Sequence, residues 1–185
     1  MVKNKNYKSR TAWQCRSWRL RVLEFAYPDG TVKERGVIDH PGSVVMVPMD
    51  GENVRILRQY RIALKSTILE LPAGTKEPEE DWLVCARREL REETGYRADQ
   101  WASLGKVWPA PGITNEVMAV YLARELSPAP LPPDADEEIE VVTYPFTDLL
   151  AMALNGDLQD AKSVVAILRT AAYLEIIPDF EGSVA

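Results

Sequence analysis

Three closely spaced glutamates are the residues of this chain best suited to chemistry. Glu89, Glu92 and Glu93 stand at positions i, i+3 and i+4, so on a helix their carboxylates share one face. Like charges at this spacing destabilise a helix, and the negative end of the helix dipole adds to the cost. A divalent cation such as Mg²⁺ or Mn²⁺ would offset the charge, since hard cations bind carboxylate oxygens and work with substrate phosphates.

Arginines alternate with these glutamates and offer a second interpretation. Arg87, Arg88 and Arg91 lie in the same stretch, and Arg88 can pair with Glu92 one helical turn later. An exposed helix face with such ion pairs would have a similar sequence. The helix alone therefore leaves a metal site and a solvated, salt-bridged face both open.

The glutamates need a helix to position them, and we expect one between Pro78 and Gly95. Proline suits the first helical turn, because its missing N–H has no partner there. Glycine is a good end, because it adopts the left-handed conformation that closes a helix. Leu83, Ala86 and Leu90 recur at helical spacing and predict a buried stripe.

The spacing of the whole stretch resembles the Nudix box, the signature of the Nudix hydrolases. The matching residues are Gly74, Glu80, Arg88-Glu89-Leu90, Glu92-Glu93 and Gly95, while the usual aliphatic residue at the end is Tyr96. From average residue usage, a chance match has a probability on the order of 10⁻⁶. The resemblance implies a loop–helix–loop with metal-binding glutamates and a nucleoside diphosphate substrate.

Two segments before the box resemble the ADP-ribose pyrophosphatase subgroup of that family. They read Arg58-Gln59-Tyr60-Arg61 and Glu70-Leu71-Pro72-Ala73-Gly74. The residues alone would allow the arginines to be surface charges or to bind phosphate through their planar guanidinium groups. The resemblance implies that Glu70 and one or both of Arg58 and Arg61 bind substrate. It also implies that the carbonyl oxygen of Ala73 binds a metal.

Two segments after the box resemble the same subgroup. The first is the loop 109–116, with Pro109, Pro111 and Gly112, followed by Glu116, which is either a surface charge or part of the site. The second is the acidic segment 134–138, in which the resemblance implies a glutamate that serves as general base or metal ligand. Related proteins often read Glu-Asp-Glu where this chain reads Ala135-Asp136-Glu137. We expect Glu137 to be that residue, with Glu138 and Asp136 as substitutes.

The resemblance thus implies a metal-dependent hydrolase that cleaves ADP-ribose, or a related nucleoside diphosphate sugar, to AMP and a sugar phosphate. Its catalytic residues would be Glu93, Glu137 and Arg88, the last orienting the carboxylates. Its metal ligands would be Ala73, Glu89, Glu92 and Glu93, with Mg²⁺ or Mn²⁺ as cofactor. Alternatives are another Nudix substrate, such as GDP-mannose, NADH or an oxidised nucleotide, and a module that senses ADP-ribose without cleaving it.

Composition narrows the class of protein. The chain has 185 residues, of which 46% are hydrophobic and 27% charged, with a net charge of −6. An acidic surface excludes nucleic acid and anionic membranes as favoured partners, and leaves a small molecule as the expected ligand. Two cysteines form no disulfide framework, and no run of 18 apolar residues is present. We therefore expect a cytoplasmic protein.

Alternating apolar residues predict strands at 17–27, 31–38, 43–49, 53–60, 101–108, 117–122 and 139–144. Helices are expected at 147–155, with Thr147 as N-cap, and at 163–174. The first ten residues are expected to be frayed. This order predicts an α/β fold with a mixed sheet between helices. The resemblance implies an α/β/α Nudix sandwich over 43–176, a small antiparallel β sheet over 1–42 that forms a homodimer, and a disordered tail over 177–185.

Overall fold

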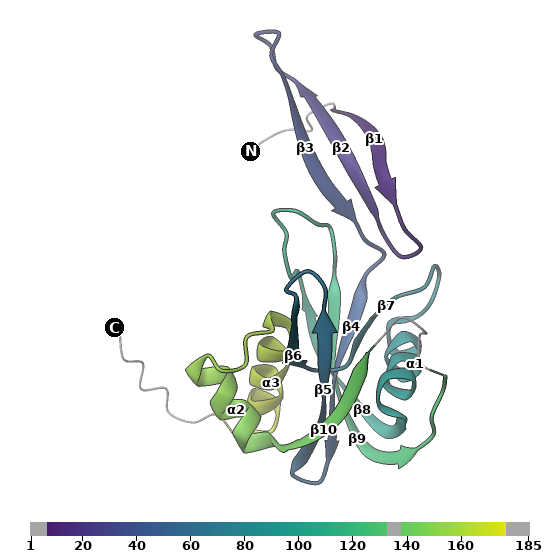
Figure 1. The fold of residues 1–185 in the computed structure, drawn as a ribbon, viewed down its shortest axis with the longest axis vertical. Coiled ribbons are helices and arrows are strands. Elements are labelled where there is room, and N and C mark those ends of the chain that lie inside the picture. Colours follow the sequence, from purple (N-terminus) through teal and green to yellow (C-terminus); the bar gives the residue numbers. More distant parts are fainter. Residues whose placement is uncertain (1–6, 133–137, 177–185) are drawn as a thin grey trace.

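The computed structural model describes residues 7–132 and 138–176. Its elements are β1 (Tyr7–Gln14), β2 (Arg19–Ala26), β3 (Val32–Asp39), β4 (Ser43–Asp50), β5 (Asn53–Arg61), β6 (Ser66–Glu70), β7 (Ala73–Thr75), α1 (Trp82–Thr94), β8 (Tyr96–Val107), β9 (Met118–Pro128), β10 (Ile139–Pro145), α2 (Phe146–Asn155) and α3 (Ala161–Tyr173). Helix α1 covers one side of a central sheet, α2 and α3 cover the other, and a separate sheet extends from one end (Figure 1).

Seven of the described strands form the central sheet. Its main order is β10-β5-β4-β9-β8, with β6 paired to β5 and β7 paired to β4. Strands β4 and β9 run parallel, whereas the other pairs are antiparallel. The predicted mixed sheet between helix layers is therefore confirmed, and so is the additional small antiparallel sheet.

Strand β4 is apolar along almost its whole length because both of its faces are covered. Val44 and Met46 pack with Cys85 of α1, whereas Val45 and Val47 belong to the core beneath α2 and α3. Successive side chains of a strand point to opposite faces. One strand thus anchors both helix layers and fixes α1 relative to the rest of the sheet.

Helix α1 begins later than its sequence predicts. We expected the first turn at Pro78, but the helix starts at Trp82, and the Asp81 side chain accepts hydrogen bonds from the backbone N–H groups of Leu83 and Val84. Glu79 has a left-handed backbone with φ of 61°, which ends any earlier helical turn. The C-terminal prediction is confirmed, because Gly95 adopts the left-handed conformation with φ of 76°.

The last two helices pack against the sheet face opposite α1. Thr147 was expected to cap α2, but the helix already starts at Phe146 and its start has no side-chain cap. The N–H of Phe146 instead donates to the carbonyl of Glu52 at 2.8 Å. Helix α3 has Asp160 as its N-cap. No helix among the described residues is long and apolar enough to cross a membrane.

Strands β1, β2 and β3 form the separate N-terminal sheet. The frayed N-terminus that we expected is wrong for residues 7–10, which belong to β1 and pair with β2. Asn115 connects this sheet to the central domain: its side chain donates to Asp39 and accepts the backbone N–H of His40, both at 2.8 Å. The turn between β1 and β2 contributes Cys15, Arg16 and Ser17 to the same cavity that Glu93 of α1 and Lys162 of α3 line.

Candidate active site

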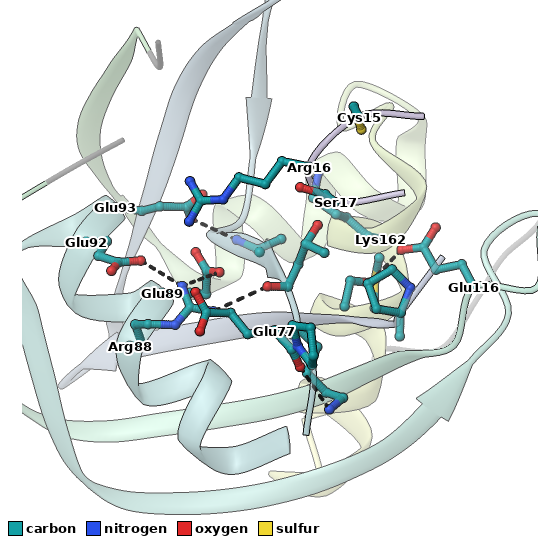
Figure 2. Close-up of a pocket in the computed structure, with 18 of the residues that line it drawn as sticks. Cys15, Arg16, Ser17, Glu77, Arg88, Glu89, Glu92, Glu93, Glu116 and Lys162 are labelled. Carbon is teal, nitrogen blue, oxygen red and sulfur yellow. Dashed lines mark hydrogen bonds and ion pairs between the residues drawn. The ribbon is translucent and has the colours of Figure 1, made fainter. Parts of the chain in front are cut away.

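A cavity of about 860 Å³ lies between α1, β7, the start of α3 and the β1–β2 turn (Figure 2). Most of the residues expected to carry chemistry line it. Those with charged side chains are Arg16, Arg61, Lys76, Glu77, Arg88, Glu89, Glu92, Glu93, Glu116 and Lys162. Its lining includes the three glutamates of α1, called here the acidic wall, and Arg61 of β5 and Lys162 of α3, called the basic wall.

Glu93 is the most buried of the three glutamates, with 7% of its surface exposed. One of its carboxylate oxygens accepts the backbone N–H of Ala73 at 2.8 Å. This bond joins the last turn of α1 to strand β7. It also brings the carboxylate beside the residue whose carbonyl oxygen is the fourth predicted metal ligand.

Glu89 lies against the backbone of Gly74. A Cβ atom at this glycine would be 1.9 Å from Cδ of Glu89, which is far inside van der Waals contact. Glycine at this position leaves room for the carboxylate, which a larger residue would displace; the backbone angle of Gly74 is not an unusual one. The box glycine and the first glutamate of the trio are thus parts of one packing arrangement.

Arg88 connects the remaining carboxylates. Its guanidinium group binds both oxygens of Glu80, at 3.0 and 3.1 Å, and its Nη1 atom lies 2.7 Å from Glu89 and 2.9 Å from Glu92. The hydrogen bonds to Glu80 are the main reason that the pKa of Arg88 is raised, and those from Arg88 lower the pKa of Glu80. The predicted Arg88–Glu92 ion pair is present, and it lies within the cavity wall.

The donor atoms on this wall suit a divalent cation. They are carboxylate oxygens of Glu89, Glu92 and Glu93 and the carbonyl of Ala73, the hard ligands that Mg²⁺ and Mn²⁺ prefer. In the described part of the chain, no group of three or more acidic, histidine or cysteine side chains is arranged so that it could already hold a metal ion. Arg88 carries one positive charge among the carboxylates of Glu80, Glu89 and Glu92, and a divalent cation would offset this excess of acidic groups.

The predicted substrate-binding residues separate into two groups. Arg61 lines the cavity, and its guanidinium group binds both oxygens of Glu70, at 2.7 and 2.9 Å. Glu70 is only 1% exposed and stands behind Arg61. Arg58 does not line the cavity but contacts Glu140 at 3.3 Å, since an odd spacing along β5 points the two arginines to opposite faces.

The candidates that follow the box are placed in part. Glu116 lines the cavity, and one of its oxygens accepts a hydrogen bond from the Ser43 hydroxyl at 2.5 Å. Glu138 is exposed before β10. Glu137, the predicted general base, and Asp136 lie outside the described residues.

Three basic residues of the cavity were missed by sequence reasoning, namely Lys76, which directly follows β7, Lys162 and Arg16. Lys162 lies at the start of α3 and contacts Glu70 and Asp160. Arg16 lies in the β1–β2 turn, and Figure 2 shows its guanidinium group extending toward Glu93. Neither Lys162 nor Arg16 belongs to a motif with a recognisable spacing. The only sequence feature that pointed to Lys162 was its position two residues after Asp160, at the start of a predicted helix.

Comparison with known proteins agrees with this geometry. A family model described as the NUDIX domain matches residues 39–166. The chain is 34% identical over 151 residues to an ADP-ribose pyrophosphatase of Bacillus subtilis, covering 80% of this chain and 82% of that protein. It is 32% identical over 176 residues to a methanol dehydrogenase activator of Bacillus methanolicus, with coverage of 90% and 92%.

A solved structure shares the fold. The crystal structure of an ADP compounds hydrolase has a TM-score of 0.80 to this chain at 22% sequence identity, covering 95% of this chain and 96% of that one. The likeness extends over the N-terminal sheet as well as the central domain. The family model and the relatives confirm the family that the spacing of the box residues predicts, and the solved structure confirms the fold.

Proposed function

We propose that this chain, which belongs to the Nudix family of hydrolases, cleaves the pyrophosphate bond of ADP-ribose or of a closely related nucleoside diphosphate sugar. The observation that carries the proposal is one cavity with opposite charges in its two walls. Glu89, Glu92 and Glu93 supply the acidic wall, and Arg61 and Lys162 supply the basic one. A diphosphate bound with divalent cations carries charges that match both walls.

The acidic wall would hold Mg²⁺ or Mn²⁺ through Glu89, Glu92, Glu93 and the Ala73 carbonyl. When bound, such a cation neutralises diphosphate charge and activates water as a nucleophile. Glu93 is kept in place by the N–H of Ala73, and Glu89 by its close contact with Gly74. Arg88 orients Glu89 and Glu92 from the side, since its guanidinium group is itself fixed by both oxygens of Glu80.

In the basic wall, Arg61 would bind the diphosphate. The guanidinium group of Arg61 lines the cavity while Glu70 holds its Nε and Nη2 edge, and a planar guanidinium suits phosphate oxygens. A water molecule then attacks one phosphorus atom, the bond from that phosphorus to the bridging oxygen breaks, and the bridging oxygen leaves with the other phosphate. The products from ADP-ribose are AMP and ribose 5-phosphate. We assign removal of the water proton to Glu137.

Replacement of Glu93 by glutamine tests this function. Glutamine keeps an oxygen that can accept the N–H of Ala73, so the E93Q protein should fold normally. Loss of the negative charge should lower Mg²⁺-dependent AMP release by at least about 100-fold. E79Q is the matched control, because Glu79 is an exposed residue of the box stretch outside the cavity lining.

A substrate panel decides between the alternatives. ADP-ribose, GDP-mannose, NADH and an oxidised nucleoside triphosphate should be assayed with Mg²⁺ and with Mn²⁺, and we expect the highest kcat/KM for ADP-ribose. Near-normal turnover by E93Q would refute the site. Tight binding of ADP-ribose without any cleavage would instead identify a sensor.

We also propose that two copies of the chain associate through the N-terminal sheet. All eight residues of β1 are exposed, including Tyr7 and Trp13, each about half exposed. A three-stranded sheet with so little covered surface gains little from its own packing. Light scattering after size exclusion should give twice the chain mass, and a single-chain mass at assay concentration would contradict the proposal.

A further inference from the structure

Lys162 joins the basic wall of the cavity to the first turn of α3. Its ammonium group contacts the carboxylate of Glu70 and lies 2.9 Å from that of Asp160. The side chain is mostly buried, with 13% of its surface exposed, and it still reaches the cavity. A lysine this buried is unusual unless it is paired, so its two carboxylate partners account for its position.

Glu70 is a buried carboxylate shared by two cations. Arg61 uses its Nε and Nη2 atoms to bind the two oxygens, and Lys162 contacts the oxygen that also accepts from Nη2. A carboxylate has room for about four donors, so both cations can bind it together.

The start of α3 holds the same segment through the backbone. The hydroxyl of Ser163 accepts the N–H of Leu71 at 2.7 Å and donates to Asp160 at 2.5 Å. Asp160 also accepts the N–H of Ser163 at 3.1 Å. Glu70 and Leu71 are therefore fixed from one side by adjacent residues of a single helix, Lys162 and Ser163.

We propose that Lys162 is a positioning residue for the substrate diphosphate. It holds the Glu70 carboxylate in the orientation that turns the guanidinium group of Arg61 toward the cavity. The inference rests on the proposed role of Arg61 in binding phosphate. It adds that this role depends on a cation supplied by α3, which lies about a hundred residues further along the chain.

A buried ion pair needs fixed geometry to be of use, because desolvation opposes it. With Lys162 present, Glu70 is restrained from two directions and Arg61 has one preferred fork position. Without it, the carboxylate can rotate about its last torsion angles and the guanidinium group follows. Substrate affinity should then fall while the chemical step, which takes place at the acidic wall, is little changed.

A double-mutant cycle with K162M and R61M tests the proposal. K162M should raise KM for ADP-ribose about 10-fold, with kcat changed less than about 2-fold. In the R61M background, K162M should raise KM no further, because its effect passes through Arg61. K162R should restore KM to within about 3-fold, and K162Q repeats the measurement if K162M does not fold.

The matched control is R169M, on the same helix but away from the cavity. Arg169 donates to the carbonyl groups of Leu104 and Lys106, so its loss should lower Tm without changing KM. A lower Tm with unchanged KM in K162M would make Lys162 merely structural and overturn the proposal. Equal effects of K162M with and without Arg61 would also overturn it. Unchanged KM in R61M alone would instead refute the proposed phosphate-binding role of Arg61.

Discussion

The two ion clusters that border the cavity have opposite designs. Around Arg88, one guanidinium group binds three carboxylates, those of Glu80, Glu89 and Glu92. Around Glu70, one carboxylate binds two cations, Arg61 and Lys162. In the first cluster three acidic groups share one base, whereas in the second two cations share the buried Glu70 and Lys162 also pairs with Asp160.

Burial explains why the two designs serve different ligands. The central carboxylate of the basic cluster is 1% exposed, so it is sealed behind its cations and only they face the cavity. In the acidic cluster the Glu92 side chain keeps 26% of its surface exposed and faces the cavity beside Arg88. Arg61 and Lys162 are therefore the groups of the basic cluster that line the cavity, together with the acidic residues of α1.

Replacement of Gly74 by alanine should produce the largest effect on this arrangement. The new Cβ would overlap the carboxylate of Glu89, whose flexible side chain can move away. We expect a normally folded protein with kcat/KM reduced at least about 100-fold. A displacement of a catalytic group by about 1 Å lowers the rate by that much. G112A is the control, because a Cβ at Gly112 meets no atom within 4 Å.

Removing one charge from one wall at a time should separate the roles of the acidic and basic walls. The expected losses of activity are smaller than that of G74A. E92Q should raise the Mg²⁺ concentration needed for half-maximal activity about 10-fold, and R61M should raise KM for ADP-ribose about 10-fold. Titrations of metal and of substrate on each variant measure both quantities. Variants that both change the metal requirement equally would show that the walls do not divide the work. R58M removes the other arginine of β5, and this variant should have an unchanged KM for ADP-ribose.

The smallest expected effect is the loss of stability when the ion pair between Glu80 and Arg88 is removed. The pKa of Glu80 lies below its ordinary value of 4.5 because Arg88 hydrogen bonds to it. A carboxylate with a lowered pKa in the folded state stabilises the fold above its unfolded pKa, and this contribution is lost as pH falls through the folded pKa. E80Q should therefore lower the free energy of unfolding by about 1 kcal/mol at pH 7.

Urea unfolding at several pH values measures this contribution. The difference between wild type and E80Q should shrink as pH falls below 4.5 and vanish once Glu80 is protonated in both states. A difference that stayed constant down to pH 2 would mean that the ion pair with Arg88 is not its source.

The acidic wall could be predicted from sequence because its parts are local. Glu89, Glu92, Glu93 and Arg88 lie within two turns of one helix, and helical geometry alone brings them together. The start of α1 could not be predicted in the same way. It depends on the left-handed backbone of Glu79 and on the N-cap formed by Asp81. From the sequence alone, a helix that starts at Pro78 is equally suitable.

The basic wall required tertiary structure. Arg61, Glu70 and Lys162 come from β5, β6 and α3, and nothing local to Lys162 indicates a distant carboxylate. The start of α2 failed for a related reason, since a backbone bond from Phe146 to Glu52 replaces the expected Thr147 cap. Local propensity therefore predicted which segments form helices and strands. Contacts across the sheet determined where those helices begin and which residues form the basic wall.

The position of β4 has a consequence for synthesis of the chain. Both helix layers pack on this strand, yet its parallel partner β9 leaves the ribosome only after α1 and β8. Pairing of strands so far apart in sequence is slow, because closure of the intervening loop costs entropy. Until β9 arrives, the nascent polypeptide exposes an apolar edge that other chains can join. Yield during expression should therefore depend on translation speed and chaperone supply as much as on the stability of the finished fold.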